Sequence, residues 1–162
     1  MPFLPFISNV GKTISKMYSL PNQESTMNIR VSDDRKLSAI QADFNALFPF
    51  LKVEFFKAPH KIGEGSMKTL LYENSRNVRY CRVRNEDGDM VITADMTVNE
   101  LEEKFLREFG LSVQVFRKSG NVWLETSATD NWTLRQQNDE GAELSTQMKG
   151  EKPADYSDHD VE

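Results

Sequence analysis

The strongest constraint on the fold is a strand–helix–strand pattern that occurs twice in the chain. Residues 27–32 alternate apolar and polar side chains, which is typical of a half-buried strand. A helix with one apolar face follows, and residues 51–56 alternate again. The same order of elements returns at residues 90–93, 97–109 and 111–116.

The two units can be aligned residue by residue. Positions 61 apart match through the first strand and the helix, and positions 60 apart match in the last strand. Shared patterning and internal duplication both explain the match. In either case, two β-α-β units predict an α+β fold, with a two-layer ferredoxin-like sandwich as the simplest arrangement. The aligned apolar pairs include Ile29 and Met90, Val31 and Ile92, Leu37 and Val98, Ile40 and Leu101, Phe44 and Phe105, and Leu51 and Leu111.

Polar residues and glycine mark the ends of the predicted helices. Asp33 or Asp34 is expected to cap the first helix. Thr97 and Glu100 have the spacing of a capping box, and Gly110 is a favourable residue just beyond a helix end. These signals place both helices between their strands.

Further segments surround this core. Residues 58–88 are an inserted basic segment, and we expect an extra strand at 78–84 within it. Residues 118–137 predict a hairpin strand followed by a short helix, which Asp130 caps and which ends near Asn138.

The net charge of −5 is unevenly distributed. Residues 138–162 hold eight acidic residues and two lysines (−6), and residues 1–26 hold two lysines and one glutamate (+1). Residues 27–137 therefore hold 16 basic and 16 acidic residues. We expect a single neutral domain at 27–137, comprising units 27–57 and 89–117 with their additions. A poorly ordered extension at 1–26, whose function stays open, and a disordered acidic tail at 138–162 flank it.

No group of side chains in the sequence predicts catalysis. His60 lies in a loop without an evident nucleophile partner, and the acidic residues near helix starts are explained by the helix dipole. Cys81 is the single cysteine, which fits a reducing, cytoplasmic location and leaves few ligands for a metal. We therefore expect no enzyme, metal site or cofactor, and no membrane span, because a long apolar run is missing.

Binding is the function that the pattern favours. Trp123 and Trp132 flank the added hairpin strand and helix, where they serve either as anchors of a satellite core or as anchors of an interface. With Arg117, they are candidate contacts to a protein partner. The partner is either another protein or a second copy of this chain in a homodimer. The contact is expected through the sheet face or an exposed strand edge.

The basic segment supports an alternative, the binding of nucleic acid or a phosphate ligand. Arg82 and Arg84 share one face of the predicted strand at 78–84. The segment 57–84 carries seven basic and two acidic residues, but the whole domain is neutral, so nucleic acid is not favoured. A glycine-containing loop with flanking lysines is the candidate anion site, formed by Lys57, His60, Lys61, Gly63, Gly65 and Ser66.

Overall fold

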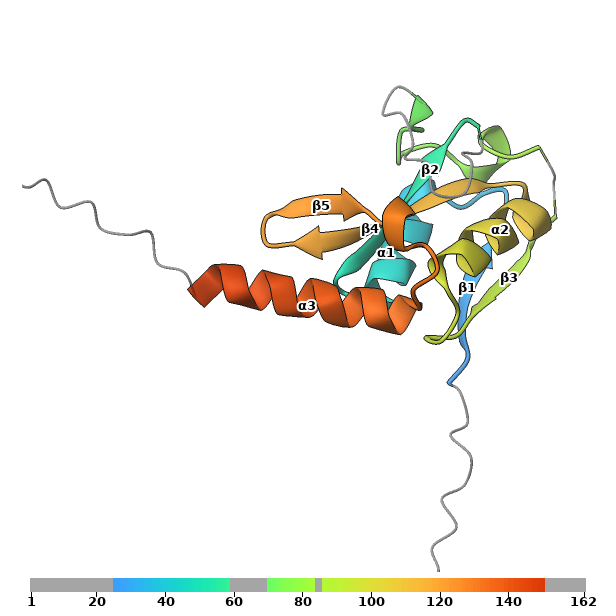
Figure 1. Cartoon of the computed structure of the whole chain (residues 1–162). Coiled ribbons are helices and arrows are strands. Elements are labelled where there is room, and N and C mark those ends of the chain that lie inside the picture. The colour runs from blue at the N-terminus through green and yellow to red at the C-terminus, as the bar shows by residue number, and fades with distance from the viewer. Residues whose placement is uncertain (1–24, 59–69, 84–85, 151–162) are drawn as a thin grey trace, which may run out of the picture.

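The chain folds into an α+β domain, seen in a computed structural model that describes residues 25–58, 70–83 and 86–150 (Figure 1). The helices are α1 (Leu37–Leu47), α2 (Val98–Phe109) and α3 (Leu134–Gly150), with 3-10 turns η2 (Val78–Tyr80) and η3 (Ser127–Thr129). The strands are β1 (Met27–Val31), β2 (Leu51–Phe56), β3 (Gly88–Ile92), β4 (Ser112–Ser119) and β5 (Val122–Glu125).

The strands form two antiparallel sheets instead of one shared sheet. β1 pairs with β3, and the second sheet has the order β2-β4-β5. The α+β class is therefore confirmed, whereas the ferredoxin-like sandwich is not. Alternating side chains show that a segment is a strand, but the choice of its partner depends on contacts far apart in sequence.

The two β-α-β units are related by an approximate two-fold rotation. Met27 pairs with Ile92, and exchanging each residue for its counterpart 61 positions away gives the pair Gly88 and Val31, which is also present. In the second sheet a shift of 60 relates the pair of Phe56 with Ser112 to the pair of Phe116 with Lys52 in the same way. The internal repeat in the sequence is thus also a repeat of strand register.

The turns before the helices obey the same relation. The turn before α1 exchanges two backbone hydrogen bonds with the start of η2, and the turn before α2 exchanges two with the start of α3. These bonds are 2.8 to 3.0 Å long. This makes the start of α3 the counterpart of η2, with a shift of 56 residues. The exchanged bonds run from Leu37 N to Arg76 O and from Val78 N to Arg35 O in the first unit, and from Val98 N to Trp132 O and from Leu134 N to Met96 O in the second.

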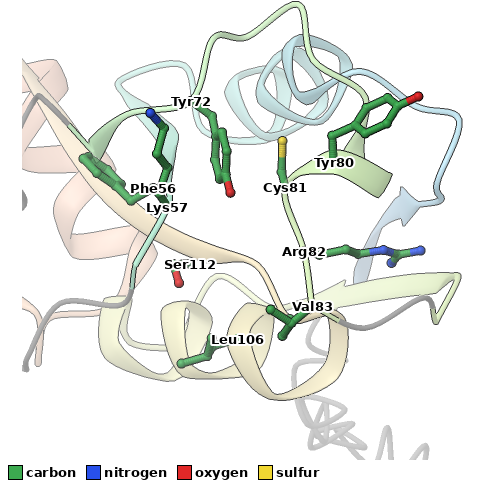
Figure 2. Close-up of a pocket in the computed structure, with 10 residues that line it drawn as sticks. Phe56, Lys57, Tyr72, Tyr80, Cys81, Arg82, Val83, Leu106 and Ser112 are labelled. Atoms are coloured by element: carbon green, nitrogen blue, oxygen red, sulfur yellow. The ribbon is translucent and has the colours of Figure 1, made fainter.

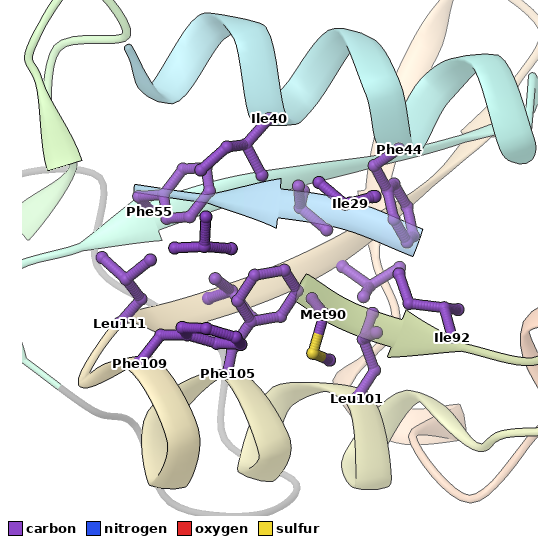
Figure 3. Close-up of a cluster of buried hydrophobic side chains, with 14 of the residues drawn as sticks. Ile29, Ile40, Phe44, Phe55, Met90, Ile92, Leu101, Phe105, Phe109 and Leu111 are labelled. Atoms are coloured by element: carbon purple, nitrogen blue, oxygen red, sulfur yellow. The ribbon is translucent and has the colours of Figure 1, made fainter. Parts of the chain in front are cut away.

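A single apolar core lies between α1 and α2 (Figure 3). The predicted faces of both helices are confirmed, because Ile40, Phe44 and Phe105 are fully buried together with residues from both sheets. The rings of Phe55 and Phe105 meet edge to face, with centroids 6.4 Å apart.

A polar pair links each helix to its following strand, partly buried in the first unit and buried in the second. Gln41 of α1 donates to the carboxylate of Glu54 on β2 at 2.8 Å. In the second unit, the Gln114 amide of β4 donates to the Glu102 carboxylate of α2 at 3.2 Å, and Val115 N donates to the same oxygen at 2.9 Å. The two units use the same two residue types in exchanged places. Each pair gives the carboxylate a hydrogen-bond donor, whereas Gln114 Oε1 is buried without a hydrogen-bond partner among the described residues.

Several local predictions need correction. The capping box of Thr97 and Glu100 is confirmed, but Lys36 is the N-cap of α1 and makes no side-chain cap bond. α3 begins with a box between Thr133 and Gln136 instead of a cap by Asp130. A side chain caps a helix only from the position next to the free amides of the first turn. In both helices this position, Lys36 or Thr133, comes two to three residues after the predicted aspartate.

Two elements differ in type or length from the prediction. α3 continues to Gly150 instead of ending near Asn138, so the beginning of the predicted acidic tail is helical. Residues 78–80 form a 3-10 turn and not a strand, because the amides of Val78 and Arg79 bond back to the turn before α1 and that of Tyr80 bonds to Asn77 O. Residues 1–24 of the predicted extension 1–26 and residues 151–162 of the predicted tail lie outside the described residues.

Candidate functional site

An open groove of about 300 Å³ lies where η2 faces the end of β2 and the last turn of α2 (Figure 2). It brings together three segments that are distant in the sequence. The principal lining side chains are Phe56, Lys57, Tyr80, Cys81, Val83 and Leu106.

The rim of this groove is apolar and accessible. Val83 is 90% exposed, Tyr80 is 67% exposed, and Leu106 is 39% exposed. Val83 and Leu106 also line an adjoining shallow depression with Glu103 and Arg107. Because soluble proteins rarely expose several large apolar side chains side by side without a use for them, this surface is a candidate interaction site.

The floor of the groove is neutral. Cys81 is only 6% exposed, and its thiol donates to the backbone oxygen of Asn77 over 3.6 Å. Burial raises the pKa of the Cys81 thiol above its ordinary 9.0, and burial likewise raises the pKa of Tyr72. Both groups are therefore protonated at neutral pH, so the floor offers no thiolate nucleophile.

Arg82 is committed to the fold and is turned away from Phe56 and Lys57 (Figure 2). Its side chain is completely buried. Nε and Nη2 donate to Asp33 Oδ1 at 3.0 and 2.7 Å, Nη2 also donates to Asp87 Oδ1 at 2.7 Å, and Nη1 donates to Glu86 O at 2.6 Å. This guanidinium joins the β1–α1 turn to the beginning of β3. It is not available to a phosphate, contrary to the interaction predicted for it.

The predicted anion loop falls mainly outside the described residues. Of its members the structure describes only Lys57, which is exposed at the edge of the groove. His60, Lys61, Gly63, Gly65 and Ser66 lie outside the described part of the chain, as does Arg84.

The two tryptophans lie apart from the groove and contact cations. Trp123 is half-buried, with the Lys52 ammonium 5.3 Å from its ring centre. Trp132 is 37% exposed and lies 5.7 Å from the guanidinium carbon of Arg117. Arg117 also donates to Gln137 of α3 at 2.8 Å, so it secures this helix to β4.

The described residues hold neither a metal-binding cluster nor a membrane-spanning helix. Residues 25–58, 70–83 and 86–150 contain no group of three or more histidine, cysteine or acidic side chains that could hold a metal ion. Among the helices in those same ranges, none combines the length and apolar composition needed to cross a membrane.

Comparisons with models of protein families, with curated proteins and with solved structures returned no match.

Sequence reasoning missed the apolar rim. Leu106 gave one signal, because it is an apolar residue of α2 that lies off the buried stripe of Leu101, Phe105 and Phe109. Val83 gave none, because the predicted strand at 78–84 places it on the same face as Arg79 and Cys81. Only the folded chain shows that the two side chains border one groove.

Proposed function

We propose that this chain is a protein-binding domain that receives a partner in the groove between η2, β2 and α2. One observation carries the proposal, the 90% exposure of Val83 near Leu106 at the edge of an open groove with a neutral floor (Figure 2). Covering a valine or leucine side chain contributes about 1.5–3 kcal/mol, so a few such side chains can anchor an interface.

Nucleic-acid binding has less support than protein binding. It depended on Arg82 and Arg84 acting together on one strand face, but Arg82 is buried among Asp33 and Asp87. The groove itself presents mainly apolar surface, which suits a protein side chain better than a phosphate backbone.

The test compares two valine variants of the full-length chain. Val83→Asp places a charge on the groove rim, and Val122→Asp makes the same change at a 54% exposed position on β5. Each variant is used as bait, and any captured protein is then purified and titrated against all three forms by calorimetry. We expect stoichiometric binding to the wild-type chain and to Val122→Asp. The affinity for Val83→Asp should be lower than that for the wild-type chain by a factor of about ten or more.

The opposite pattern would contradict the proposal. A partner that binds Val83→Asp as tightly as the wild-type chain does not use the groove. Loss of binding in Val122→Asp alone would assign the interface to the edge of β5. Sedimentation of the same three proteins shows whether the captured partner is a second copy of this chain.

A further inference from the structure

We infer that the occupant of the groove is an α-helix of the partner, with acidic residues beside its apolar face. This inference rests on the proposed function and deepens it. It comes from the two-fold relation between the β-α-β units, which makes the groove the counterpart of the place where α3 lies.

In the second unit, α3 packs closely against the start of β2 and the end of β4. Asn138 Oδ1 accepts a hydrogen bond from Phe50 N at 3.0 Å, and Gln137 accepts one from Arg117 at 2.8 Å. Gly141 lies so close that a Cβ there would be 2.8 Å from Phe50 Cβ. This surface is therefore a seat for a helix, and α3 fills it.

The same positions in the first unit line the groove. Lys57 is the counterpart of Arg117, and Gly110 is the counterpart of Phe50, by the shift of 60 that relates β2 to β4. Cys81 and Arg82, which also line the groove, are the counterparts of Gln137 and Asn138, the α3 residues that contact the seat, by the shift of 56 that relates η2 to α3. A helix that continued from η2 would occupy the groove, but the chain ends its 3-10 turn at Tyr80.

The differences between the two seats indicate what the helix must present. The Phe50 side chain leaves space only for a glycine of α3 at its contact with that helix. Its counterpart Gly110 has no side chain and leaves room for a large apolar residue. Lys57 lines the groove, which has no acidic residue among its described lining residues. The adjoining depression is lined by Arg107 and by one acidic residue, Glu103. A helix with leucine-like side chains at spacings of three and four, flanked by aspartate or glutamate, complements this surface.

The test selects the occupant from a library. A phage library of 17-residue helices with randomised faces is panned against the full-length chain, and enriched peptides are synthesised. We expect amphipathic sequences with acidic flanks whose anisotropy-measured affinity falls about tenfold with Val83→Asp and is unchanged with Val122→Asp. Lys57→Glu should weaken them and should favour the same peptides with lysine in place of the acidic residues.

A proline at the centre of each peptide separates the two proposals. Proline breaks a helix at a cost of about 3 kcal/mol, so binding should be lost if the bound form is helical. Peptides that depend on Val83 but tolerate proline would overturn the helix and leave the proposed function in place. Peptides indifferent to Val83→Asp would overturn both.

Discussion

Replacing Arg82 by methionine should destabilise the domain far more than the same change at Arg79. Arg82 is completely buried and donates to Asp33, Asp87 and the Glu86 backbone, whereas Arg79 is exposed and donates at 3.3 Å to Asp33 O. Methionine keeps much of the length and apolar volume of the arginine stem. The substitution therefore removes the guanidinium and its bonds with little change in packing.

The magnitude follows from the burial of the partners. Removing one member of a buried ion pair costs about 3–5 kcal/mol, because the remaining charge stays desolvated. Here the carboxyl side chains of Asp33 and Asp87 are 33% and 44% exposed, so water can partly replace the lost donor. We therefore expect a loss at the lower end, about 3 kcal/mol for Arg82→Met. A surface change such as Arg79→Met should stay within about 0.5 kcal/mol.

Urea unfolding of the wild-type chain and both variants, followed by circular dichroism, measures these differences. The variants should share one slope, so that a shift in midpoint reports stability alone. Equal midpoints for Arg82→Met and Arg79→Met would show that the buried ion pairs contribute nothing net, and would refute the reasoning.

Three further predictions follow from individual positions. Lys36→Thr should raise stability by about 1 kcal/mol in urea unfolding, because it supplies to α1 the side-chain cap that Thr97 supplies to α2. Gly141→Ala should lower the melting temperature despite a helix-propensity gain of about 1 kcal/mol, because its Cβ would lie 2.8 Å from Phe50 Cβ and overpacking costs about 1–3 kcal/mol. The free energy of unfolding should fall as pH rises above 9, because the raised pKa of Cys81 means that the folded chain holds the thiol proton more tightly than the unfolded chain. Urea titrations over a series of pH values measure this fall, and Cys81→Ala should make it less steep.

The features that could be predicted from the sequence depend on neighbouring residues. The apolar faces of α1 and α2 follow from spacings of three and four, and the cap at Thr97 follows from the Glu100 three positions later. The pairing of β1 with β3 could not be predicted in this way, because any alternating strand satisfies the same pattern.

The length of α3 escaped prediction for a different reason. Beyond Asn138 the helix has few large apolar residues, so its composition resembles a solvated tail. It nevertheless packs on β4 with small residues, because Gly141 is buried close to the Phe50 backbone and the Arg117 side chain, and Ser145 is also buried. Counting apolar residues overlooks contacts that depend on the absence of a side chain.

Among the differences between the two units, the one at the counterparts Asn138 and Arg82 bears most directly on the groove. Asn138 accepts a hydrogen bond from Phe50 N, which holds α3 against β2 as the helix continues. Its counterpart Arg82 instead bonds to Asp33 and Asp87, which draws the chain after η2 toward the start of β3. In the described part of the first unit no helix follows η2 to cover Lys57 and the apolar rim, and the ion pairs of Arg82 hold the chain on this other course. Under conditions where Arg82→Met remains folded, peptide affinity should still fall, because Val83 would no longer be held at the edge of the groove.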